Sequence, residues 1–142
     1  PGEVSAQALV VALGQFLYAL PRPVVPYWLW PEASLAASRS EAQGEDGAED
    51  RDRAAALNTP QMRAYCHRLL QQLPLLNYNT LVFVLSYLRF VLTHAASNRV
   101  SVQRLGTFCD SCLSGHAADK NKRCALRECF EYFLTCDASE FA

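Results

Sequence analysis

Residues 58–93, NTPQMRAYCHRLLQQLPLLNYNTLVFVLSYLRFVLT, contain two helical patterns separated by Leu73-Pro74. Thr59 followed by Pro60 predicts a helix start, because threonine is a good N-cap and proline suits the first helical position. The apolar residues of the first pattern share one helical face: Met62, Tyr65, Cys66, Leu69, Leu70 and Leu73. From about Tyr78 to Thr93 the sequence is apolar nearly all round, which predicts a helix central to a bundle.

The flanking segments also favour helices. Residues 4–20 are apolar almost all round, which predicts a helix buried on more than one side and ended by the prolines after Leu20. Residues 24–30 are expected to form a short helix or an extended brace. A turn at 95–99 precedes a helix capped by Ser101 and ending at Leu113. After a polar loop at 114–121, a last helix is predicted by one apolar face: Leu126, Cys129, Phe130 and Phe133. Because no segment alternates with a period of two, the fold class is all-α.

An acidic insertion interrupts this pattern. Residues 39–53, RSEAQGEDGAEDRDR, hold six acids and three arginines but no large apolar side chain. Such a segment cannot bury enough surface to offset its ordering entropy, so we expect a disordered insertion at 36–55. An acidic docking loop or a phosphorylation loop is the alternative.

Composition narrows the function classes. The chain has 142 residues, 51% hydrophobic and 19% charged, with a net charge of -1. This length and composition describe a single packed domain. Nucleic-acid binding needs a basic surface, and with this net charge we expect no nucleic-acid partner. The longest apolar run, 81–92, is shorter than the roughly 20 residues of a membrane span, so no membrane insertion is expected. The first residue is Pro1 rather than methionine, from which we expect a piece of a larger protein.

The cysteines and histidines suggest other sites. No asparagine lies in a glycosylation sequon, so we expect reduced thiols in a cytoplasmic protein. Cys109, Cys112 and His116, with Cys124 and Cys129, suggest a zinc site, but cysteines on an apolar helical stripe are more often buried thiols. Adjacent Cys66 and His67 do not face each other on a helix and predict no nucleophile. With no second CxxC pair we expect no metal, and with no Gly-rich phosphate loop we expect no cofactor.

Three stretches together resemble the RhoGAP domain family. Residues 13–24, LGQFLYALPRPV, match its LKxxLRxLPxPL segment, and residues 73–81, LPLLNYNTL, match its LPxxNYxTL segment. Residues 105–113, LGTFCDSCL, occupy the place of LAxVFxPxL, after Asn98-Arg99-Val100 in the place of NxM. Their order and spacing agree over roughly residues 5–113, apart from the acidic insertion. The resemblance implies a helical bundle that binds Rho-type GTPases, here without its N-terminal helices.

The resemblance also implies a loss of catalysis. Members of the family accelerate GTP hydrolysis with an arginine finger, an effect of about 10³–10⁵ in rate, and this arginine lies upstream of the LKxxLR segment. In this sequence the first arginine is Arg22. Gly14 stands for the family's lysine, Tyr18 for its arginine and Cys112 for its asparagine, so three positions that contact the GTPase are replaced. We therefore expect no catalytic residue and no enzymatic activity in this domain.

Within the family, residues 8–25, ALVVALGQFLYALPRPVV, and 107–113, TFCDSCL, resemble the inactive C-terminal domain of the Lowe (oculocerebrorenal) syndrome type of inositol polyphosphate 5-phosphatase. This implies a non-catalytic module that binds Rho-family GTPases or endocytic adaptor peptides, within a larger phosphoinositide phosphatase recruited to endosomal or other membranes. The alternatives are an active GTPase-activating domain with its arginine upstream of residue 1, and a zinc-stabilised module.

Four further residues are candidate partner contacts: Asn77, Arg89, Trp28 and Trp30. Aromatic residues are common at binding hot spots. The favoured alternative is that Tyr27, Trp28 and Trp30 cover the end of the bundle where upstream helices are missing. Arg89 lies in an apolar helix, where it either extends to the bundle edge or pairs with a carboxylate.

Overall fold

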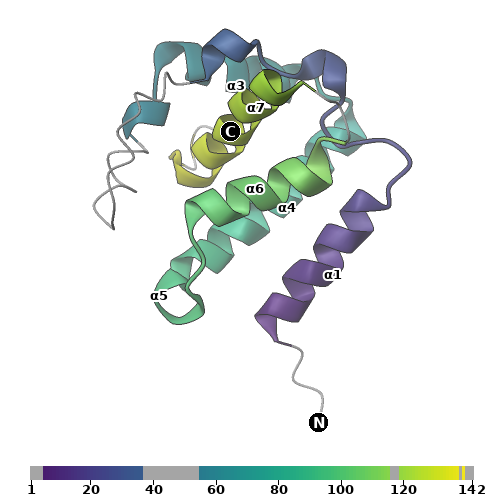
Figure 1. The fold of residues 1–142 in the computed structure, drawn as a ribbon, viewed down its shortest axis with the longest axis vertical. Coiled ribbons are helices and arrows are strands. Elements are labelled where there is room, and N and C mark those ends of the chain that lie inside the picture. The colour runs from purple at the N-terminus through teal and green to yellow at the C-terminus, as the bar shows by residue number, and fades with distance from the viewer. Residues whose placement is uncertain (1–4, 37–54, 116–118, 138, 140–142) are drawn as a thin grey trace.

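The computed structural model describes residues 5–36, 55–115, 119–137 and 139 of the chain, and within them it contains helices and no strands. Figure 1 shows the arrangement: α6 and α4 run side by side, α3 and α7 lie together at one end, and α1 lies at the outer edge. The all-α prediction is confirmed.

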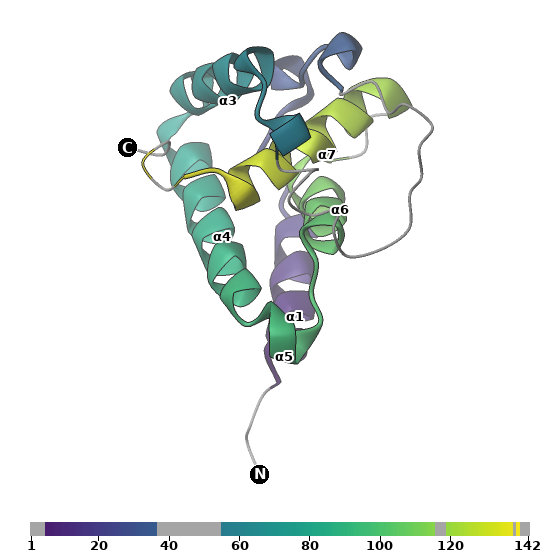
Figure 2. The same cartoon turned by 90° about the vertical axis from the view of Figure 1, so that its left-hand side faces the viewer.

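Helix α7 (Lys120–Thr135) is the centre of the core. It packs against α6 (Val102–Leu113), α4 (Leu75–Thr93), α3 (Pro60–Gln72) and the 3-10 helix η2 (Ala33–Leu35). Figure 2 shows α7 passing between α3, α4 and α6. The predicted face of this helix is buried, since Leu126, Cys129 and Phe130 have no exposed surface and Phe133 is 2% exposed.

Capping residues set the helix starts as the sequence predicts. The Thr59 hydroxyl accepts from the Met62 amide at 3.1 Å, with Pro60 in the first position of α3. The Ser101 hydroxyl accepts from the Arg104 amide at 3.2 Å at the start of α6. The sequence places α4 three residues too late, because Pro74 serves as its N-cap residue and α4 begins directly after it.

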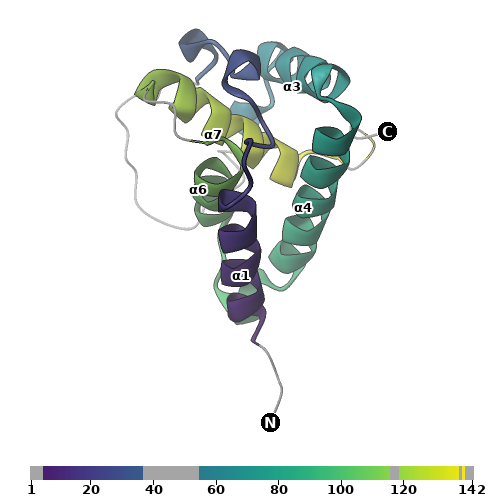
Figure 3. The ribbon, with the colours of Figure 1, turned by 90° about the vertical axis from the view of Figure 1, so that its right-hand side faces the viewer.

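Helix α1 (Ala6–Tyr18) begins after Ser5, whose hydroxyl accepts from the Ala8 amide at 3.1 Å. The expectation that it is buried on more than one side is wrong. It packs mainly against α6 at the edge of the bundle, as Figure 3 shows, so Leu17 is buried whereas Leu9, Val11 and Phe16 are exposed. An apolar composition does not by itself tell which faces a neighbouring element covers.

Helix α4 is likewise buried on one face only. Leu81, Val84, Leu85, Leu88 and Val91 face the core, while four large apolar side chains remain exposed: Leu75, Leu76, Phe83 and Phe90. The helix has 19 residues, and an 18-residue window of it has a mean hydropathy of 1.4, so it is long and apolar enough to cross a membrane by length and composition alone. The core helix of a soluble protein passes the same test, so the length argument based on residues 81–92 does not separate the two cases. In the bundle its buried face contacts α6 and α7.

Two of the connecting segments contain short helices. The 3-10 helix η1 (Tyr27–Leu29) lies between extended residues, so residues 24–30 combine the helix and the brace that the sequence leaves open. The expected turn at 95–99 contains the short helix α5 (Ala95–Asn98), and Arg99 ends it in the left-handed region with φ of 58°. The predicted insertion at 36–55 lies outside the described residues, except for Ala36 and Ala55.

Candidate protein-interaction site

Two adjacent hollows form one groove between α1 and α6. The first has a volume of about 340 Å³ and the second about 220 Å³, and they share Tyr18, Ser111 and Cys112. We call the two together the α1–α6 groove. Its remaining lining residues are Val11, Gly14, Gln15, Phe108, Leu17, Leu20, Pro21, Pro23, Tyr27, Ser114 and Gly115. None of these lining residues carries a formal charge.

The three replaced positions of the sequence analysis all line this groove. Gly14 and Tyr18 come from one face of α1, four residues apart, and Cys112 comes from the last turn of α6. Tyr18 is 59% exposed and Cys112 is 6% exposed. The structure therefore brings together residues that are almost one hundred positions apart in the sequence.

Gly14 is where the ring of Phe108 approaches α1. A Cβ atom at Gly14 would lie 2.7 Å from Cε2 of Phe108, a distance that real Cβ atoms do not reach. Any larger side chain at this position requires Phe108 to move. The missing side chain at Gly14 is thus accompanied by an aromatic side chain that occupies its place.

Burial makes Cys112 a poor nucleophile and a poor ion-binding group. Loss of hydration raises the pKa of its thiol to about 12, against a hydrogen bond from its own backbone that lowers it, so the neutral thiol lines the groove. The adjacent Ser111 hydroxyl donates to the carbonyl of Thr107 in its own helix at 2.8 Å. The floor of the groove is therefore neutral at physiological pH.

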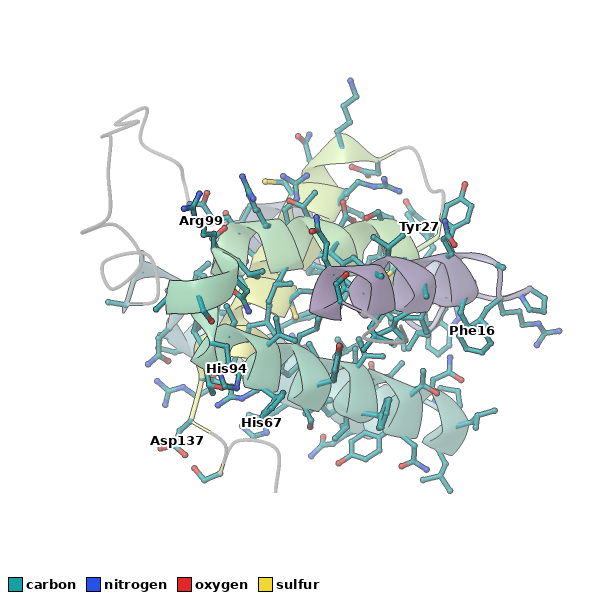
Figure 4. The ribbon with its side chains drawn as sticks, turned by 90° about the horizontal axis from the view of Figure 1, so that it is seen from below. Phe16, Tyr27, His67, His94, Arg99 and Asp137 are labelled. Carbon is teal, nitrogen blue, oxygen red and sulfur yellow. The ribbon has the colours of Figure 1, made fainter. Side chains whose placement is uncertain are left out.

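The aromatic residues of the segment 27–30 have different roles, and of these only Tyr27 lines the groove. Trp30 is 6% exposed, and its indole Nε1 donates to the carbonyl of Val25 at 3.3 Å. Trp28 is 70% exposed and Tyr27 is 48% exposed. Figure 4 shows Tyr27 and Phe16 at the end of the molecule opposite His94 and Arg99. Trp30 serves the core, whereas Trp28 and Tyr27 present aromatic surface to solvent.

Two other candidate contacts hold backbone groups inside the fold. The Asn77 side chain donates from Nδ2 to the carbonyl of Val24 at 2.9 Å, which ties the first turn of α4 to the segment that follows α1. Arg89 donates from Nη1 to the carbonyl of Phe133 at 2.8 Å, near the end of α7. These bonds account for both residues within the domain, and their contact with a partner stays a prediction.

The cysteines do not assemble into a ligand set in the described part of the chain, where no group of three or more metal-ligating side chains occurs. Cys109 and Cys112 are buried along α6, as the sequence predicts, while Cys129 lies 3.2 Å from Cys66. His116 lies outside the described residues. Burial raises the pKa of the Cys109 thiol, with Cys112 and Asp110 adding to the rise.

Sequence reasoning missed Val11, Gln15 and Phe108 as groove residues. Val11 and Gln15 share the face of α1 that carries Gly14 and Tyr18, so helical spacing alone places them there. Phe108 comes from α6 and has no local signal. Only the packing of α1 on α6 shows that it meets Gly14.

Comparison with known proteins gives one result. The model of the RhoGAP domain matches residues 1–118. No curated protein and no solved structure gives a significant match. Helix α7 lies beyond the matched residues, although it is the most buried helix of the bundle. The match covers well over half of the chain, and the chain therefore belongs to the RhoGAP domain family, whose members interact with Rho-family small GTPases.

Proposed function

We propose that this domain binds Rho-family GTPases through the α1–α6 groove and does not accelerate their GTP hydrolysis. The proposal is carried by one observation: the three positions that resemblance assigns to GTPase contact, Gly14, Tyr18 and Cys112, open onto a groove with no charged lining residue. The transition state of phosphoryl transfer gathers negative charge, and its stabilisation needs cations or strong hydrogen-bond donors. A neutral, largely apolar groove supplies contact area without that stabilisation.

The replacement at Gly14 supports this proposal most directly. A lysine is a point charge on a flexible stem, and no side chain at all stands in its place. Because Phe108 occupies the adjacent space, a single substitution of Gly14 does not restore the cationic arrangement. Exposed Tyr18 adds aromatic contact surface in place of an arginine.

Binding and catalysis are separated by measuring both on the same samples. Each Rho-family GTPase is tested for binding in its GTP-analogue form and for single-turnover GTP hydrolysis with excess domain. We expect binding, with a hydrolysis rate within about twofold of the intrinsic rate, against the roughly 10³–10⁵-fold of an arginine-finger GTPase activator. A large acceleration that is lost on replacing one arginine by alanine would overturn the proposal and favour the active alternative.

Groove variants locate the binding surface. Tyr18→Ala removes an exposed aromatic side chain from the groove, and we expect it to weaken GTPase binding by about tenfold, as is usual for aromatic contacts. Phe83→Ala is the matched control, because Phe83 is 69% exposed on α4 and does not line the groove. Equal losses in both variants would place the GTPase elsewhere.

We further propose that the domain docks an endocytic adaptor peptide and belongs to a larger inositol polyphosphate 5-phosphatase in the cytoplasm, recruited to endosomal membranes through its partners. The support is the apolar pattern of residues 8–25 and 107–113, and the exposed Trp28. Immunoprecipitation of the natural protein, followed by a phosphoinositide 5-phosphatase assay and identification of bound adaptors, tests this. A natural protein without phosphatase activity contradicts it.

A further inference from the structure

Cys66 and Cys129 meet in the core between two helices. Their Sγ atoms are 3.2 Å apart and form a thiol–thiol hydrogen bond in which either sulfur is able to donate. Cys66 lies in the middle of α3 and Cys129 in the middle of α7, 63 residues apart in the sequence. Both belong to the apolar core, with Cys66 2% exposed and Cys129 fully buried.

We propose that Cys66 and Cys129 are a disulfide-forming pair that links α3 to α7 when the protein meets a hydroperoxide oxidant. A disulfide needs two sulfur atoms about 2.05 Å apart, so the pair closes with a shift of roughly 1 Å. The two helices already pack against each other, and Figure 2 shows α3 next to α7 in the upper half of the view.

The chemistry is balanced by one molecule of hydrogen peroxide. One thiolate attacks a peroxide oxygen, the O–O bond breaks, and the released hydroxide takes a proton to leave as water. The sulfur of the second cysteine then attacks the resulting sulfenic acid, the S–S bond forms, and a second water leaves with the remaining thiol proton. The two thiols lose two electrons in total, and the peroxide gains them.

The surroundings keep the pair reduced until such an oxidant reaches it. Burial raises the pKa of the Cys129 thiol, and the neighbouring Cys66 raises it further. A buried, protonated thiol reacts slowly, whereas hydrogen peroxide is small enough to enter when α3 and α7 open locally. The pair therefore differs from an exposed reactive cysteine. Its oxidation leads to a disulfide because the two sulfur atoms are already in contact.

The consequence is a covalent tie behind the α1–α6 groove. Helix α7 packs on α6, which supplies Phe108 and Cys112 to the groove, and α3 holds Leu29 through a bond from the Tyr65 hydroxyl at 2.7 Å. Joining α3 to α7 fixes the two elements on which α6 and the segment 24–30 rest. This inference does not depend on the proposed GTPase binding.

Peptide mapping of the folded protein tests the link. The protein is treated with hydrogen peroxide, its free thiols are blocked, and it is digested with trypsin without reduction. Cys66 is then in the peptide 64–68, AYCHR, and Cys129 is in the peptide 128–142, which also contains Cys136. A Cys136→Ser variant removes this ambiguity and is expected to keep the cross-link, while Cys129→Ala loses it.

Thermal unfolding supplies a second measurement. Oxidation is expected to raise the Tm of the Cys136→Ser variant by about 10 °C, since a cross-link over a long loop restricts the unfolded chain. The Cys129→Ala variant, checked for its helical circular dichroism, should show no such rise. Free thiols at Cys66 and Cys129 in the folded, peroxide-treated protein would overturn the proposal, as would a cross-link that forms only in urea.

Discussion

At the scale of single residues, the contact between Gly14 and Phe108 is the most informative. Glycine in the middle of a helix costs about 0.5–1 kcal/mol relative to alanine, yet a Cβ at Gly14 would be 2.7 Å from the Phe108 ring. We expect Gly14→Ala to give no gain in the free energy of unfolding, whereas in a Phe108→Ala background the same change gains about 0.5–1 kcal/mol. Urea unfolding of the four proteins measures the coupling. Additive effects would show that the ring moves aside freely.

Asn77 supports the segment beside the groove. Its side chain donates to the carbonyl of Val24, and Val24 is buried. We expect Asn77→Ala to lower the free energy of unfolding by about 1–2 kcal/mol, and Asn77→Asp to lower it more, because a carboxylate offers no donor and repels the carbonyl oxygen. Asn79→Ala, on the exposed side of the same helix turn, is the control for chemical denaturation. Equal effects at the two positions would contradict this role.

The groove residues show how far sequence reasoning reaches at this scale. The sequence singles out Gly14, Tyr18 and Cys112 because each departs from a family pattern at a fixed spacing. The structure places all three along one groove. Phe108 was not found, since its importance depends on which side of α6 faces α1. Asn77 belongs to a matched motif, but only the structure identifies its acceptor as a carbonyl 53 residues away.

At the scale of elements, the helix starts that carry a capping side chain are predictable from the sequence, whereas the start of α4 and the neighbours of each helix are not. Ser5, Thr59 and Ser101 cap helices through bonds that span only three residues, so local sequence determines these starts. The exposure of Phe16 on α1 and of Phe83 on α4 depends on which helices pack against them. An apolar helix has several faces that are suitable for burial, and its own sequence does not choose among them.

A hydrogen bond from α4 is expected to hold the last turn of α7 in place. Phe133 lies in the last turn of α7, where carbonyls lack partners within the helix, and Arg89 of α4 donates to its carbonyl at 2.8 Å. Arg89→Met keeps much of the apolar stem and removes the donor. We expect amide exchange at residues 132–136 to accelerate by about tenfold or more, as for loss of about 1.5–3 kcal/mol.

Hydrogen exchange monitored by mass spectrometry measures the rate of amide exchange separately in each helix. Peptides from α1 serve as the internal control, because α1 lies at the opposite edge of the bundle. A uniform acceleration in both regions would indicate a global loss of stability rather than a local release of α7. No change at residues 132–136 would mean that Arg89 is not what holds this turn.

At the scale of the whole molecule, two carboxyl groups of the described residues contribute to the dependence of stability on pH in opposite directions. Burial raises the pKa of Asp110 above its ordinary value, although Arg123, the Ser114 hydroxyl and Arg127 act to lower it. The exposed Asp137 has a lowered pKa, because the amide and side chain of Ser139 hydrogen-bond to its carboxylate. Asp137 stabilises the fold above its unfolded pKa, and this stabilisation is lost as the pH falls through its folded pKa.

Asp110 acts in the reverse direction. The folded state binds its proton more tightly than the unfolded chain does, so its favourable contribution is complete below the ordinary pKa and is lost as the pH rises through the raised pKa. Asp110→Asn keeps an acceptor for the Ser114 hydroxyl and removes this titration. We expect the variant to lack that decline and to lie within about 1 kcal/mol of the natural protein at pH 7, because the ion pairs at 3.8 and 3.9 Å are offset by the cost of burying the carboxylate. Urea unfolding between pH 4 and about pH 8 measures both curves. Parallel curves, with the variant less stable by more than about 2 kcal/mol, would show that Arg123 and Arg127 outweigh the burial of Asp110.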